Sequence, residues 1–155
     1  MKRFYLILVF TLSCFLSINA QEDLTRILFI FDASNSMNDK WEGERKIEVA
    51  KEMLVATVDS MRSIPNLEVA LRVYGHQSPI TPSFQDCNDT KLEVPFSKNN
   101  FSKLIGTIKG IQAKGTTPIA RSLEKSAADF PDRLANNIII LIKSTQIEIE
   151  ITSTT

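Results

Sequence analysis

The sequence predicts an α/β fold in which a mostly parallel sheet is flanked by helices. Three segments have the length and composition of buried or half-buried strands, namely residues 26–31, 67–74 and 138–142. Between them lie segments whose apolar residues recur at spacings of three and four, which is typical of one face of a helix. Because strands and helices alternate along the chain, we expect parallel strands joined by crossover helices.

The first helix is expected from Arg45 to about Met61, and Pro65 follows its end. A second helix follows a cap at Ser97, and a third opens at Pro118, whose missing amide hydrogen would have no partner there. The apolar positions of the three helices are Ile47, Ala50, Leu54, Val58 and Met61, then Phe101, Leu104, Ile105, Ile108 and Ile111, then Ile119, Leu123, Ala127 and Phe130.

Residues 91–96 can form a short strand, which Pro95 would confine to an edge of the sheet. The long segment 77–90 before it is expected to be a loop, and loops of this length are often functional or flexible. Asp86 and Asp89 are expected to hold this loop in place. His76 is the single histidine of the chain, so we expect it to make a hydrogen bond rather than to bind a metal.

The composition limits the class of protein to which this chain can belong. The 155 residues suffice for one domain, and 43 % of them are hydrophobic, so a packed core is possible. The formal net charge is zero and no long basic patch occurs, which argues against a nucleic-acid partner.

Residues 1–20 have the pattern of a secretory signal peptide. Lys2 and Arg3 precede an apolar stretch over 4–16, and Ala20 ends a suitable cleavage site. The apolar stretch is short for a membrane span, so we expect an exported protein, periplasmic, secreted or at the cell surface. It would stay at a membrane if this segment were not cleaved. Cys87 would then be the single cysteine of the exported chain, either free or paired with a cysteine outside this sequence.

Asp32, Ser34 and Ser36 form a D-x-S-x-S motif directly after the first predicted strand. The carboxyl ends of parallel strands are where open α/β sheets place their ligand sites. Alternate residues of an extended turn can converge on one ion, and carboxylate and hydroxyl oxygens suit magnesium, calcium or manganese. The alternative for these residues is a capping turn without a ligand.

The segment Gly115-Thr116-Thr117-Pro118 lies downstream, also before a helix. Together with the D-x-S-x-S motif, this pairing resembles the von Willebrand factor type A (vWA) domain family. The resemblance covers about residues 26–142 and implies a Rossmann-like, doubly wound sheet. It also implies a metal-ion-dependent adhesion site built from Asp32, Ser34, Ser36 and Thr117, with Thr116 as the second choice of register. Thr117 can alternatively be read as an ordinary helix cap.

The same resemblance implies a binding module rather than an enzyme. The cation would be Mg²⁺, or alternatively Mn²⁺ or Ca²⁺, and the partner would be a protein that offers a carboxylate to it.

The chain departs from the family after the strand at 138–142. The family usually continues with Ser or Thr and then Asp-Gly, whereas here Lys143 is followed by Ser144 and Thr145. Ser144 stands in the place of the aspartate and is a second-choice ligand. Since a neutral hydroxyl attracts a cation less, we expect weak binding, at about millimolar affinity.

The tail after this point does not resemble the family, so we expect a fold that is incomplete at its C-terminal end. The expected organisation is a signal peptide over 1–20, a partial vWA domain over 26–145 and an atypical tail over 146–155. Because Ile147, Ile149 and Ile151 alternate with polar residues, the tail is either a strand that covers a sheet edge or an aggregation-prone segment.

Two other functions fit parts of the sequence. A magnesium-dependent phosphatase of the haloacid dehalogenase type also has an aspartate after an apolar strand, but its chemistry needs D-x-D, and Ala33-Ser34 supplies no second carboxylate. The other alternative is a fragment without activity that cannot close its sheet.

Overall fold

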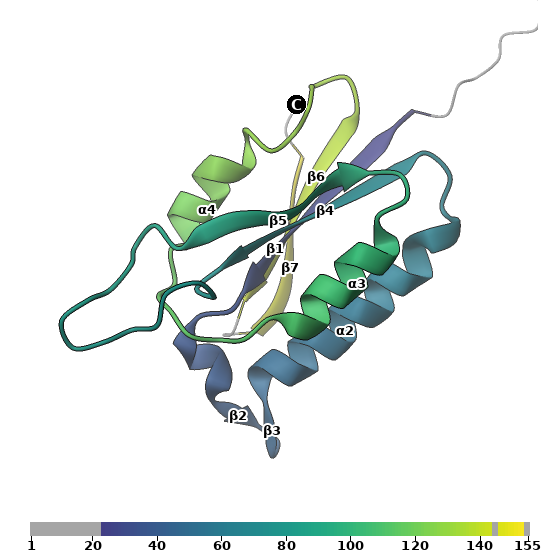
Figure 1. Ribbon diagram of the computed structural model, residues 1–155. Helices are drawn as coiled ribbons and strands as arrows, with labels where there is room; N and C mark the ends of the chain where they lie inside the picture. The colour runs from purple at the N-terminus through teal and green to yellow at the C-terminus, as the bar shows by residue number, and fades with distance from the viewer. Residues whose placement is uncertain (1–22, 144–145, 154–155) are drawn as a thin grey trace, which may run out of the picture.

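The computed structural model describes residues 23–143 and 146–153. Its centre is a five-stranded sheet in the order β5-β4-β1-β6-β7 (Figure 1). β1 (Thr25–Asp32) pairs in parallel with β4 (Leu67–Tyr74) and with β6 (Asn136–Lys143). β5 (Thr90–Ser97) and β7 (Gln146–Ser153) run antiparallel at the two edges. The predicted fold class, a mostly parallel sheet flanked by helices, is confirmed.

One face of the sheet is covered by α2 (Lys46–Ser60) and α3 (Phe101–Gly110), as Figure 1 shows. The alternation of β1 sends Phe29 and Phe31 to this face, where they pack with the apolar positions predicted for the two helices. The buried helical members of this cluster are Ile47, Ala50, Leu54, Val58, Phe101, Leu104 and Ile108. The predicted bounds of the first helix are correct to one residue at each end.

The other face carries α4 (Ile119–Ser126), and a smaller core that includes Leu28, Ile30 and Tyr74. The predicted apolar face of this helix is wrong at Leu123, which is 38 % exposed. Ser122 and Ser126 are buried instead. The reason is that α4 meets polar groups of the sheet. The Ser122 hydroxyl donates a hydrogen bond to Thr90 Oγ1 (2.9 Å).

β4 is buried at every residue except the half-buried Glu68, more than an alternating strand would be. The residues that alternate with its leucines and valines are more polar, yet two of them, Arg72 and Tyr74, are only 6 % and 0 % exposed. Both face α4, and Arg72 is neutralised there by Asp129, which follows that helix.

The strand predicted over 91–96 is the edge strand β5, and Pro95 lies within it. The predicted strand in the tail is β7, which pairs with β6. Four short elements are not signalled by the sequence, because they are only two to four residues long. After β1 come the 3-10 helix η1 (Asn35–Asn38) and a small hairpin of β2 (Lys40–Trp41) and β3 (Glu44–Arg45), and the 3-10 helix η2 (Met61–Ser63) follows α2.

The predicted signal segment over 1–20 and the second-choice ligand Ser144 lie outside the described residues. Within the described ranges, no helix has the length and apolarity needed to cross a membrane.

Candidate functional site

Three loops meet where β1 and β4 end, and backbone hydrogen bonds join them. The Ala33 amide donates to the Tyr74 carbonyl (2.9 Å), which extends the β1–β4 pairing by one residue. The Asn35 amide donates to the Gly115 carbonyl (2.8 Å), and the Gly115 amide donates to the Gly75 carbonyl (2.7 Å). The D-x-S-x-S motif and the Gly115–Pro118 segment therefore lie side by side, as the family resemblance implies.

Gly75 lies at the centre of this convergence. Its φ of +72° is in the left-handed region that favours glycine. A Cβ atom at this position would lie 2.5 Å from the Thr116 carbonyl oxygen and 2.7 Å from Ser34 Cα. The loops approach so closely that only a residue without a side chain fits between them.

Asp32 is fully buried, and its two carboxylate oxygens are in different situations. Oδ1 accepts a hydrogen bond from the Ser34 amide (2.8 Å). Oδ2 is buried and has no hydrogen-bond partner in the described part of the chain. The Ser34 and Ser36 hydroxyl oxygens lie 3.1 Å apart, so the motif brings two hydroxyls together two and four residues after Asp32.

Tyr74 is the neighbour of Asp32 across the β1–β4 pairing, and it is a site residue that the sequence does not reveal. Burial, then the negative charge of Asp32 and the contact with its side chain, strongly raise the pKa of the Tyr74 hydroxyl, which therefore stays neutral. This hydroxyl faces the Asp32 carboxylate but does not meet the geometry of a full hydrogen bond to it, so it has no hydrogen-bond partner among the described residues. The only sequence signal for it is its position at the end of a strand, just before a glycine.

The two threonines of the Gly115–Pro118 segment have different surroundings. The Thr116 hydroxyl donates a hydrogen bond to the Asp86 carbonyl and so holds the long loop against the site. Thr117 is exposed. This difference favours Thr117 over Thr116 as the residue whose hydroxyl can bind a ligand.

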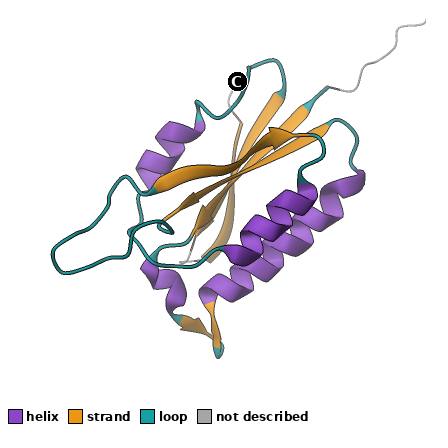
Figure 2. Ribbon diagram, in the orientation of Figure 1, coloured by secondary structure: helices purple, strands orange, loops and turns teal. Residues whose placement is uncertain are grey.

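The long loop between β4 and β5 extends from the same end of the sheet (Figure 2). The buried Asp89 carboxylate accepts hydrogen bonds from the Gln77 and Ser78 amides, each at 3.0 Å, and from the Gln77 side chain (3.0 Å). His76 Nε2 lies 2.8 Å from Glu93 Oε1. The predicted role of Asp89 in holding this loop is confirmed, and His76 makes a hydrogen bond as predicted. Cys87 in the loop is free and exposed.

A cation at this site would depend mainly on hydroxyl ligands. In the described ranges, no three histidine, cysteine, aspartate or glutamate side chains are grouped so that they could hold a metal ion. Asp32 is the one carboxylate of the D-x-S-x-S motif.

The chain was compared with protein families, with curated proteins and with solved structures. No protein-family model matches the chain. The uncharacterized protein YwmD of Bacillus subtilis is 29 % identical over 122 residues, which cover 76 % of this chain and 54 % of YwmD. The chain thus spans about half the length of this relative.

Solved structures with the same fold include pilus proteins. The PilB minor pilin of Streptococcus sanguinis matches 79 % of this chain and 30 % of its own, with a TM-score of 0.62 and 18 % identity. The vWF domain of the pilus tip protein Mfa5 from Porphyromonas gingivalis matches 78 % of this chain and 38 % of its own (TM-score 0.61, 17 % identity). The pilus adhesin SpaC of Lactobacillus rhamnosus GG matches 87 % and 18 % (TM-score 0.61, 15 % identity). The chain therefore has a vWA-like fold.

Proposed function

We propose that this chain is an exported binding module that holds a divalent cation at the ends of β1 and β4 and uses it to bind a carboxylate of a partner protein. The observation that carries the proposal is the buried Oδ2 atom of Asp32, which has no hydrogen-bond partner in the described part of the chain. Burying an ionised carboxylate oxygen without a partner is costly, and a cation would offset this cost.

Asp32, Ser34 and Ser36 would hold the cation together with Thr117 from the adjoining segment. Thr116 and Ser144 are second choices. The hydroxyl of Thr116 already donates a hydrogen bond to the Asp86 carbonyl of the long loop. The hard oxygen donors suit Mg²⁺, Mn²⁺ or Ca²⁺. Because the hydroxyls are neutral, the ion would keep most of its charge for an incoming carboxylate, which is the chemistry that the cation supplies when bound.

The same charge count argues for weak affinity. Oxygen-ligand sites lose affinity as the number of charged ligands falls, so we expect binding in the millimolar range.

Two further points support a binding function outside the cell. The fold neighbours include a minor pilin, a pilus tip protein and a pilus adhesin, which are named for assembly and attachment rather than for catalysis. The pattern of residues 1–20 is that of an export signal. A phosphatase reaction is disfavoured because the motif lacks the second carboxylate that this chemistry needs.

The test is thermal unfolding of the protein with and without Mg²⁺ or Mn²⁺. We expect the cation to raise the melting temperature of the wild type, with a stabilisation of about 1.4 kcal/mol at ten times the dissociation constant. Asp32→Asn is expected to lose this response.

Asp39→Asn is the matched control, because it removes the same charge from an exposed aspartate just after η1. It should keep the full cation response. A wild type that does not respond to either cation, or an Asp32→Asn variant that responds as strongly as the wild type, would contradict the proposal.

A further inference from the structure

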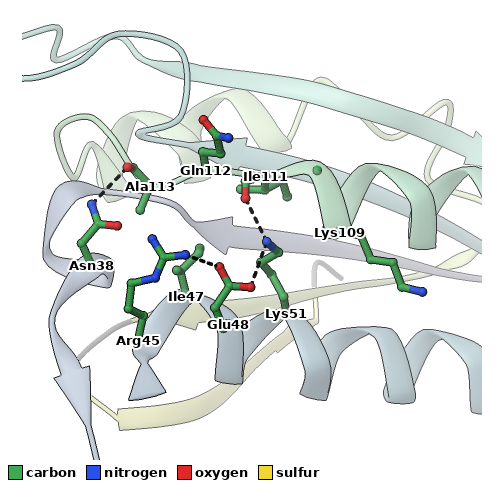
Figure 3. A pocket seen from close by; sticks show the side chains of 10 residues that line it. Asn38, Arg45, Ile47, Glu48, Lys51, Lys109, Ile111, Gln112 and Ala113 are labelled. Atoms are coloured by element: carbon green, nitrogen blue, oxygen red, sulfur yellow. Dashed lines mark hydrogen bonds and ion pairs between the residues drawn. The ribbon is translucent and has the colours of Figure 1, made fainter. Parts of the chain in front are cut away.

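A second concave surface lies between α2 and α3, next to η1. It consists of two adjoining hollows of about 460 Å³ and 260 Å³, which share Glu48, Lys51 and Lys109. Figure 3 shows the larger hollow, which extends from Asn38 to Lys109. We call the two hollows together the α2–α3 trough. None of the four first-choice cation ligands lines it.

The larger hollow carries an excess of positive charge. Arg45, Lys51 and Lys109 line it, against the single carboxylate of Glu48. Glu52 adds a second carboxylate in the smaller hollow, so the two hollows together hold three cationic and two acidic side chains. Glu48 is already paired with Arg45 (2.9 Å) and with Lys51 (3.2 Å). Lys109 is exposed and has no ion-pair partner among the described residues. Its position in the last turn of α3 complements the helix dipole, but this leaves its ammonium group open to a further anion.

The walls of the trough are cross-linked, so its shape is set before any partner arrives. Lys51 Nζ donates to the Ile111 carbonyl (3.1 Å), which ties α2 to the segment after α3. Asn38 Nδ2 donates to the Ala113 carbonyl (3.1 Å), which ties η1 to the same segment. Both bonds are drawn in Figure 3. A preformed groove loses less entropy on binding than one that must be ordered.

The lining of the trough is partly apolar. Ala113 in the larger hollow and Val55 in the smaller one are partly exposed, whereas Ile47 and Ile111 lie at the floor of the larger hollow and are almost fully buried. A free inorganic anion gains nothing from such contacts. A polypeptide segment that carries both apolar and acidic side chains can use the apolar lining and the cationic rim together.

We propose that the α2–α3 trough is an interaction surface for an acidic segment of a partner polypeptide, whose carboxylates pair with Lys109 and Arg45. This surface needs no metal ion, so it is independent of the proposed cation site.

The experiment measures the fluorescence anisotropy of a labelled peptide that alternates Glu and Leu, titrated with the purified protein in EDTA and low salt. EDTA removes divalent cations, so a failure of the cation site does not affect this test. We expect saturable binding that weakens as salt is added. The same peptide with Gln in place of Glu should bind at least tenfold more weakly.

The two variants used in this test both lie on α3. Lys109→Glu should weaken binding about tenfold or more. Lys103→Glu makes the same charge change at another exposed position of α3 that does not line the trough, and it should bind within twofold of the wild type. Circular dichroism melts of both variants verify that the fold persists.

Three outcomes would overturn the proposal. These are no binding by the wild type, an equal loss in the Lys103→Glu and Lys109→Glu variants, and displacement of the peptide by inorganic phosphate at matched ionic strength. Equal loss would mean general attraction to a basic surface, and displacement by phosphate would mean a site for small anions.

Discussion

Asp32 and Tyr74 show how much of the candidate site depends on single residues. Asp32, Ser34 and Ser36 could be predicted because they are neighbours in sequence and follow an apolar strand. Tyr74 could not, because its position beside Asp32 depends on the register between β1 and β4. Because β1 and β4 are far apart in the sequence, their register depends on how the apolar faces of both strands pack, and no motif beside Tyr74 reveals it.

Replacing Tyr74 by Phe tests whether the Tyr74 hydroxyl lowers the stability of the folded protein. An unpartnered buried hydroxyl costs about 1–3 kcal/mol, and the substitution changes little volume. We therefore expect the Tyr74→Phe variant, measured by thermal unfolding without cation, to be as stable as the wild type or more stable. A clear loss of stability would mean that the hydroxyl hydrogen-bonds to Asp32 in solution.

At the scale of elements, α4 is joined to the sheet by a buried polar network. Arg72 donates two hydrogen bonds of 2.6 Å to the carboxylate of Asp129, and both side chains are 7 % exposed. Arg72 also donates to Thr90 Oγ1 (3.2 Å), to which Ser122 of α4 donates as well. The Ser122 hydroxyl oxygen also lies 2.9 Å from the Pro118 carbonyl oxygen and shares its one hydrogen between the two acceptors, so the network reaches the residue after Thr117.

This network explains why the face of α4 was predicted incorrectly. Apolar periodicity points to Leu123, but where Ser122 and Ser126 are buried α4 meets the polar groups of Arg72 and Thr90, so serines fit there better than leucine. The three strands of the parallel centre and the long helices could be predicted because apolar periodicity does describe how they are buried. Pattern reading fails where burial is achieved by hydrogen bonds.

Arg72→Met is expected to destabilise the protein by about 3–5 kcal/mol in urea unfolding, because it leaves the buried Asp129 carboxylate without its partner. Arg121→Met is the matched control, since Arg121 forms an exposed ion pair with Glu124 on α4, and exposed pairs contribute about 0–1 kcal/mol. The double variant Arg72→Met/Asp129→Leu should recover part of the loss. Similar losses in the two single variants would contradict a special role for the buried pair.

At the scale of the whole molecule, β1 is the centre of the fold. It pairs with β4 on one side and β6 on the other, and Leu28, Ile30 and Phe31 in it are fully buried. β5 pairs on one side only and has an irregular register with β4. Local opening should therefore be rarer in β1 than at this edge.

Amide hydrogen exchange followed by mass spectrometry measures this order. We expect peptides from β1 and β4 to be the slowest to exchange and peptides from β5 to exchange at least tenfold faster. Uniform protection across the sheet would mean that it opens only as one unit.

The sheet also separates the molecule into two poles. The motif loops and the long loop with Cys87 lie at the pole where β1 and β4 end, whereas Leu134, which is 95 % exposed, precedes β6 at the opposite pole. If the protein were attached to a bead or sensor chip through residue 134, these loops would point away from the support. Cys87 would be replaced by serine, so that its thiol cannot react at the opposite pole.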